Sequence, residues 1–147
     1  MINTPMELAI GIILGFATVI LAKVTGFSRD RGFYPLLLIV IALYYVLFAF
    51  QYAVNTAILL EVGIALIFSV LAFIGHKRSL IIVAAGLALH GIYDLLHSAI
   101  PYTTEAPDWW AMFCLGFDVV LAIGLLLAIR WYKYQNNKSQ YHERNES

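Results

Sequence analysis

The sequence predicts an all-α integral membrane protein, a five-helix bundle with its N-terminus outside and its C-terminus in the cytoplasm. Three observations support this fold class. The 147 residues are 62% hydrophobic and only 12% charged, whereas a soluble domain carries roughly 25% charged residues. Five segments have the length, about 20 mainly apolar residues, that crosses a bilayer as a helix. All nine lysines and arginines fall on one side of a five-span arrangement.

The predicted spans cover residues 6–24, 33–53, 57–75, 80–100 and 109–131. The second and third are separated only by Asn55 and Thr56, but a single helix over both would be too long for one crossing. Ser79 is expected to cap the fourth helix. The spans make one transmembrane domain, residues 1–131, and residues 132–147 form a polar cytoplasmic tail that we expect to be frayed or disordered.

The basic residues orient this arrangement. They lie in the loops after the first and third spans and in the segment after the fifth, and the positive-inside rule makes that side cytoplasmic. The first apolar run has no basic residue before it and carries Glu7, the reverse of a secretory signal, so we expect it to remain as a span. The net charge of zero gives no indication of a nucleic-acid partner. Cys114 is alone, which excludes an intramolecular disulfide, and its apolar surroundings favour a buried small side chain.

Ionisable residues inside the spans point to a functional site, because such groups are costly in a bilayer. His90, Asp94 and His97 have the i, i+4, i+7 spacing of one helical face. Glu61 on the third span and Asp118 on the fifth are expected at similar depth, in the outer half of the membrane. The sequence therefore predicts one polar pocket that opens toward the outer side.

Small residues share the helical faces of these acidic groups, which is typical of packed membrane-helix interfaces. These residues are Ala57, Ala65, Ser69 and Ala72 on the third span, Ala111, Cys114 and Ala122 on the fifth, and Gly11, Gly15, Thr18 and Ala22 on the first.

The Gly-x-x-x-Gly pair of the first span favours packing within the chain, with a homodimer contact as the alternative. Tyr44, Tyr45 and Tyr93 can supply hydroxyl partners, although we expect ordinary packing for at least two of them.

The preferred hypothesis is a divalent metal site, with Zn, Fe or Mn as the ion. His90, Asp94 and His97 are the metal-ligand candidates, and Asp118 and Glu61 are ligand or general-base candidates for hydrolysis of a lipid-like or small-molecule substrate. The two histidines are about 10–11 Å apart along the helix axis. A single ion would therefore be bound by one histidine and Asp94 together with the other carboxylates, unless the site holds two ions.

Two other functions are compatible with the same residues. A proton- or cation-coupled carrier or channel component would use the polar cluster as its vestibule, although the inner half of the spans offers no further acidic groups. A structural membrane protein would use the cluster only to fix helix packing.

The segment Phe-Ser-Arg-Asp-Arg-Gly-Phe-Tyr-Pro at 27–35, together with Glu61 and His-Gly-x-x-Asp-x-x-His at 90–97, resembles a family of small bacterial multi-pass membrane proteins of unknown function. The resemblance covers the spans and not the tail. It implies a bacterial inner-membrane location, and it does not indicate any particular activity. Intramembrane hydrolases of the alkaline ceramidase class also place His and Asp on membrane helices. They have seven spans and more histidines, so the similarity to them is a chemical analogy.

Overall fold

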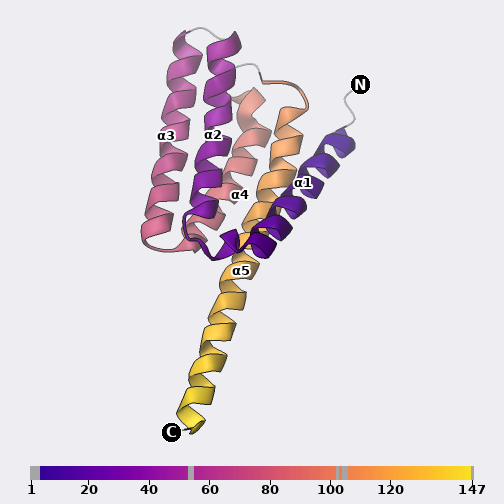
Figure 1. Ribbon diagram of the computed structural model, residues 1–147. Helices are drawn as coiled ribbons and strands as arrows, with labels where there is room; N and C mark the ends of the chain where they lie inside the picture. Colours follow the sequence, from indigo (N-terminus) through magenta and orange to yellow (C-terminus); the bar gives the residue numbers. More distant parts are fainter. Residues whose placement is uncertain (1–3, 53–54, 102, 104–105, 147) are drawn as a thin grey trace.

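The computed structural model describes residues 4–52, 55–101, 103 and 106–146. Within these residues the chain is all-α, as predicted, and all five helices are long and apolar enough to span a membrane. Figure 1 shows the helices α1 (Thr4–Thr25), α2 (Phe33–Tyr52), α3 (Asn55–Lys77), α4 (Leu80–Leu96) and α5 (Trp110–Glu146), with the short 3₁₀ turns η1 (Phe27–Arg29) and η2 (His97–Ala99).

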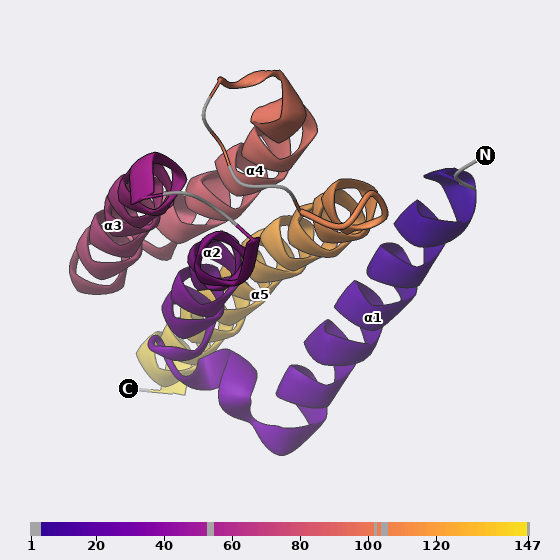
Figure 2. The same cartoon turned by 90° about the horizontal axis from the view of Figure 1, so that it is seen from above.

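Helix α5 is the central element of the bundle. It packs against α1 on one side and α4 on the other, while α2 pairs with α3, and α3 also contacts α4. Figure 2 shows α1 at the edge of the bundle, beside α5 and running away from α2 toward its N-terminus. The apolar core lies where α2, α4 and α5 meet, around the fully buried side chains of Leu38, Leu87 and Leu121.

The contact between α1 and α5 depends on glycine. A Cβ atom on Gly11 would lie 2.0 Å from the backbone oxygen of Phe113, and one on Gly15 would lie 2.9 Å from the Val120 side chain. Both positions allow the helix backbones to approach more closely than any other residue would permit. The Gly-x-x-x-Gly pair therefore serves packing within the chain, as the sequence favoured.

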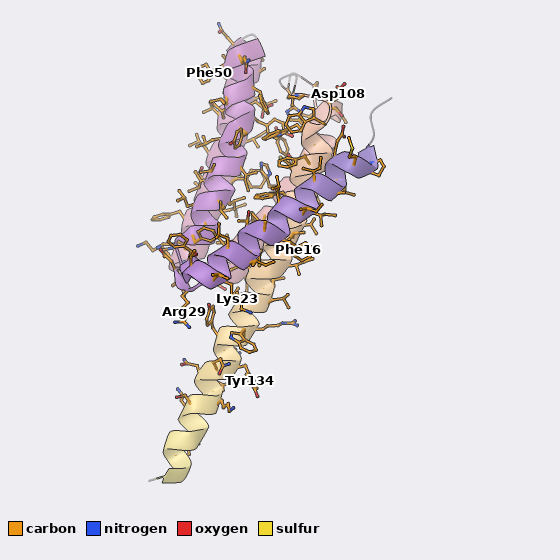
Figure 3. The ribbon with its side chains drawn as sticks, turned by 45° about the vertical axis from the view of Figure 1, so that its right-hand side comes forward. Phe16, Lys23, Arg29, Phe50, Asp108 and Tyr134 are labelled. Atoms are coloured by element: carbon orange, nitrogen blue, oxygen red, sulfur yellow. The ribbon has the colours of Figure 1, made fainter. Side chains whose placement is uncertain are left out.

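The basic residues gather at one end of the bundle, which we call the basic end. Figure 3 shows Lys23 and Arg29 there and Phe50 and Asp108 at the opposite end. At the basic end α1 stops at Gly26, whose φ of 84° lies in the left-handed region that glycine adopts without strain.

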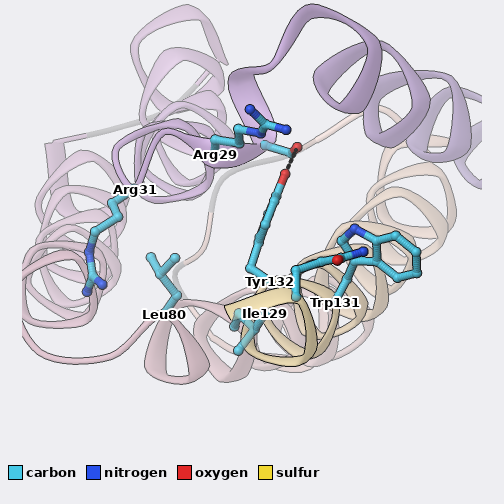
Figure 4. Close-up of a pocket in the computed structure, with 8 residues that line it drawn as sticks. Arg29, Arg31, Leu80, Ile129, Trp131 and Tyr132 are labelled. Atoms are coloured by element: carbon cyan, nitrogen blue, oxygen red, sulfur yellow. Dashed lines mark hydrogen bonds between the residues drawn. The ribbon is translucent and has the colours of Figure 1, made fainter. Parts of the chain in front are cut away.

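The loop that follows α1 is tied to α5 and α3. The hydroxyl groups of Ser28 and Tyr132 share a hydrogen bond of 2.8 Å, which Figure 4 shows beside Arg29 and Arg31 in a pocket of about 720 Å³. The Arg31 guanidinium donates to the backbone oxygen of His76 over 3.2 Å. The first bond holds the loop against α5, and the second holds it against the end of α3.

The second and third spans are separate helices, as predicted, since α2 ends at Tyr52 and α3 begins at Asn55. Asn55 and Thr56, which were expected between the two spans, belong instead to α3. The predicted cap of the fourth helix is confirmed. The Ser79 side chain accepts a hydrogen bond from the Ile81 N–H over 3.3 Å, as expected of an N-cap.

The tail differs from its prediction. Residues 132–146 are not frayed but continue α5, which has 37 residues and runs past the bundle (Figure 1). At 1.5 Å per residue it is about 55 Å long, compared with about 30 Å for the hydrocarbon core of a bilayer. The polar segment extends a helix that already exists, so it bears no nucleation cost, and its Lys, Gln, Arg and Glu residues favour helix.

Candidate functional site

Five acidic or histidine side chains are buried in the part of the chain that the structure describes, each no more than 5% exposed. They come from α3, α4, η2 and α5, and all lie in the half of the bundle away from the basic end. They are the five residues that the sequence singled out: Glu61, His90, Asp94, His97 and Asp118. The predicted gathering of these groups at one depth is therefore confirmed.

Three of the five form a compact cluster, which we call the His/Asp cluster. Nδ1 of His90 lies 2.8 Å from Oδ2 of Asp118 and 3.4 Å from Oδ2 of Asp94. His90 and Asp94 are one turn apart on α4, so they share a face, and Asp118 approaches them from α5. One ligand atom from each residue lies within 4.8 Å of the other two, so the three residues can hold a single metal ion.

The His/Asp cluster is incompletely satisfied by hydrogen bonds. Nε2 of His90, Oδ2 of Asp94 and Oδ1 of Asp118 are buried and have no hydrogen-bond partner among the described residues. Each such atom costs about 1–3 kcal/mol of desolvation free energy that no bond offsets. Nε2 of His90 lies across the ring from Nδ1, so the spare ligand capacity beside Nδ1 is that of the two carboxylate oxygens.

The remaining two ionisable residues form a separate pair. Nε2 of His97 lies 2.9 Å from Oε1 of Glu61, and the Tyr93 hydroxyl donates to Oε2 of the same carboxylate over 2.7 Å. His97 was a predicted metal ligand, but it lies with Glu61 and outside the group of three. The physical reason is its distance along the axis: two turns separate it from His90, and η2 begins at His97.

Tyr45 on α2 joins the cluster to the pair. Its hydroxyl donates to Oδ1 of Asp94 over 2.8 Å, and its ring stacks on the His97 imidazole with ring centroids 4.1 Å apart. On the other side, Phe68 meets the ring of His90 edge-on, with centroids 4.8 Å apart. The polar groups are thus enclosed by aromatic side chains from α2 and α3.

The tyrosines correct one expectation from the sequence. Ordinary packing was expected for at least two of the three, but Tyr45 and Tyr93 both donate to buried carboxylates. Tyr44 is 41% exposed and packs on the Trp110 ring. Tyr93 could have been found, because it lies beside Asp94 on the polar face of its helix. Nothing in the sequence distinguishes Tyr45 from Tyr44, since only the rotation of α2 decides which of them faces inward.

The donor set of the His/Asp cluster could hold a metal ion. Nδ1 of His90 is at hydrogen-bond distance, 2.8 Å, from Asp118 and 3.4 Å from Asp94, and ligands of one metal ion are separated by similar distances. One imidazole and two carboxylates suit Zn, Fe or Mn. Three protein ligands also leave a coordination position open, as in catalytic metal sites.

Comparison of the chain with models of known protein families, with curated proteins and with solved structures found no match. The function must therefore be argued from the residues of the site.

Proposed function

We propose that this protein is a multi-pass membrane protein that binds one divalent metal ion, Zn, Fe or Mn, through His90, Asp94 and Asp118. The observation that carries the proposal is the convergence of three buried ligand residues, one ligand atom from each lying within 4.8 Å of the other two, with Oδ2 of Asp94 and Oδ1 of Asp118 left without a hydrogen-bond partner among the described residues. The charge balance supports it as well. Two carboxylates beside one imidazole in an apolar interior are stabilised by a cation that neutralises their charge.

The other polar residues have supporting roles in this proposal. Tyr45 fixes the orientation of Asp94 through its hydroxyl, in the way that outer hydrogen bonds orient metal ligands. Glu61 is held by His97 and Tyr93 and is the general-base candidate for hydrolysis of a lipid-like or small-molecule substrate. A bound divalent ion would supply Lewis acidity and an activated water for such a reaction.

The two alternative functions have less support. A proton-coupled carrier needs polar groups along the whole path, but the five buried acidic and histidine residues of the described chain all lie in one half of the bundle. A purely structural network gains its stabilisation from satisfied pairs. Glu61 and His97 fit that role, whereas three buried atoms of the His/Asp cluster have no hydrogen-bond partner among the described residues.

We also propose that the basic end is cytoplasmic and that the membrane is a bacterial inner membrane. The first part is supported by the positive-inside rule, since all nine lysines and arginines flank that end. The second part is supported by the resemblance of the chain to small bacterial membrane proteins. In this orientation the His/Asp cluster belongs to the outer half of the bilayer.

Elemental analysis of the detergent-purified protein tests the proposal. The wild type, as isolated or after incubation with Zn, Mn or Fe salts and desalting, is expected to hold close to one ion per chain. The double variant His90→Ala/Asp94→Ala is expected to hold none while it still elutes as a folded protein in size-exclusion chromatography. Absence of metal from the wild type under all these conditions would overturn the proposal.

A further inference from the structure

The Glu7 carboxylate lies apart from both the His/Asp cluster and the Glu61–His97 pair, in a groove formed by α1, α2 and the first turns of α5. The groove has a volume of about 700 Å³ and lies at the end of the bundle away from the basic end. Its lining is mostly apolar; the polar groups are the Glu7 carboxylate, the Tyr44 hydroxyl and the indole N–H groups of Trp109 and Trp110, of which that of Trp110 has no hydrogen-bond partner among the described residues. The residues that define it are Glu7, Tyr44, Trp109, Trp110, Phe113 and Phe117.

Glu7 is turned toward this groove by the packing of α1 on α5. It lies one turn before Gly11 on the same helical face, and Gly11 contacts the backbone of Phe113. The Oε2 atom of Glu7 is buried and has no hydrogen-bond partner among the described residues. No lysine, arginine or histidine is among the described residues that line the groove.

Aromatic rings make up most of the remaining wall. The rings of Tyr44 and Trp110 have centroids 5.0 Å apart, and those of Trp109 and Trp110 lie 5.5 Å apart. Aromatic faces attract cations through their quadrupoles, most strongly when the cation is poorly hydrated. A carboxylate beside several such rings is the combination that recognises ammonium and quaternary ammonium groups.

The same lining disfavours other occupants. A small metal ion such as Mg²⁺ or Ca²⁺ needs about six oxygen ligands, and the groove has one carboxylate. An anion would be repelled by Glu7. The volume falls within the roughly 300–1,000 Å³ of small-molecule sites.

We propose that this groove binds an amphiphilic organic cation, an ammonium or quaternary ammonium group carried on an apolar body. The charged group lies at Glu7, and the apolar body lies along the aromatic wall of α2 and α5. Met6, Ile10 and Tyr44 are about half exposed along the groove, so such a molecule can enter sideways from the bilayer. This site is independent of the metal proposal, and either can fail without the other.

The test compares two probes of the same shape and opposite charge, tetraphenylphosphonium and tetraphenylborate. Binding is measured by equilibrium dialysis of the full chain in dodecyl maltoside, with protein-free micelles subtracted. We expect saturable binding of about one phosphonium ion per chain and no binding of the borate above the micelle background. Equal binding of both probes, or of neither, would overturn the proposal.

Single-residue variants then test whether the Glu7 carboxylate is the charge that binds the phosphonium ion. Glu7→Gln keeps the shape of the side chain and is expected to weaken phosphonium binding at least tenfold, while Glu7→Asp retains part of it. Asp108→Asn removes one negative charge from the same end of the bundle but outside the groove, and it is expected to change nothing. Unchanged binding in Glu7→Gln, or an equal loss in Asp108→Asn, would contradict the assignment. Size-exclusion elution and thermal unfolding are measured on the same samples, and unchanged values show that the bundle is intact.

Discussion

The hydroxyl of Tyr45 donates to Oδ1 of Asp94 over 2.8 Å, and its ring stacks on His97. This side chain from α2 is thus the connection between the His/Asp cluster and the Glu61–His97 pair. It leaves Oδ2 of Asp94 facing His90, at 3.4 Å from Nδ1. Tyr45 is therefore expected to control the orientation of one metal ligand without contacting the metal.

Replacing the tyrosine hydroxyls separately tests this role. Tyr45→Phe keeps the stacked ring but removes the bond to Asp94, so we expect metal affinity to fall about 10–100-fold, the usual effect of losing a bond that orients a ligand. Tyr93→Phe is the matched control, because its hydroxyl binds Glu61 and not the cluster. Chelator competition measures both affinities, and equal losses in the two variants would contradict the assignment.

Metal binding is expected to stabilise the fold. A ligand that binds only the folded state at 100 times its Kd adds about 2.7 kcal/mol to the free energy of unfolding. The Tm of the metal-free protein, measured as the loss of monodisperse protein after heating, is expected to rise when the ion is added. The Asp118→Asn variant is expected to show no shift. A wild type whose Tm does not respond to the ion would contradict a site inside the bundle.

The contact between α1 and α5 gives a prediction about packing. A methyl group at Gly11 overlaps the backbone of Phe113, so Gly11→Ala is expected to destabilise the protein by about 1–3 kcal/mol, as overpacking does. Gly63→Ala meets no atom within 4 Å and gains helix propensity, so its Tm is expected to be unchanged or higher. Thermal unfolding of the two variants in the same detergent checks both effects, and a neutral Gly11→Ala would show that this contact is not tight in solution.

The orientation can be tested with introduced cysteines, because the native Cys114 is buried and should not react. Asp108 and Asn137 are exposed at opposite ends of the bundle. In intact cells a membrane-impermeant maleimide is expected to label Asp108→Cys, whereas Asn137→Cys reacts only after the membrane is opened. The reverse pattern would place the basic end outside.

The sequence predicted the spans and the depth of the polar residues because hydropathy and helical rise determine both. It also placed His90, Asp94 and Asp118 in one site. It did not predict that the five side chains divide into the His/Asp cluster and the Glu61–His97 pair. That division depends on how α3 and α5 are rotated and shifted relative to α4. Glu61 could pair with either end of the His-x-x-x-Asp-x-x-His face, and only the packed bundle brings it to His97. The helical tail was missed because a polar segment shows no hydrophobic periodicity, although it continues a helix that already exists.

The most direct test of the metal site removes one carboxylate at a time. Asp118→Asn and Glu61→Gln each delete one buried negative charge and keep the size of the side chain, but only Asp118 belongs to the His/Asp cluster. Metal stoichiometry and Kd, measured on both variants beside the wild type, are expected to show loss of the ion in Asp118→Asn and near-normal binding in Glu61→Gln. Retention of the ion by Asp118→Asn, or its loss in Glu61→Gln alone, would contradict the assignment of His90, Asp94 and Asp118 as its ligands.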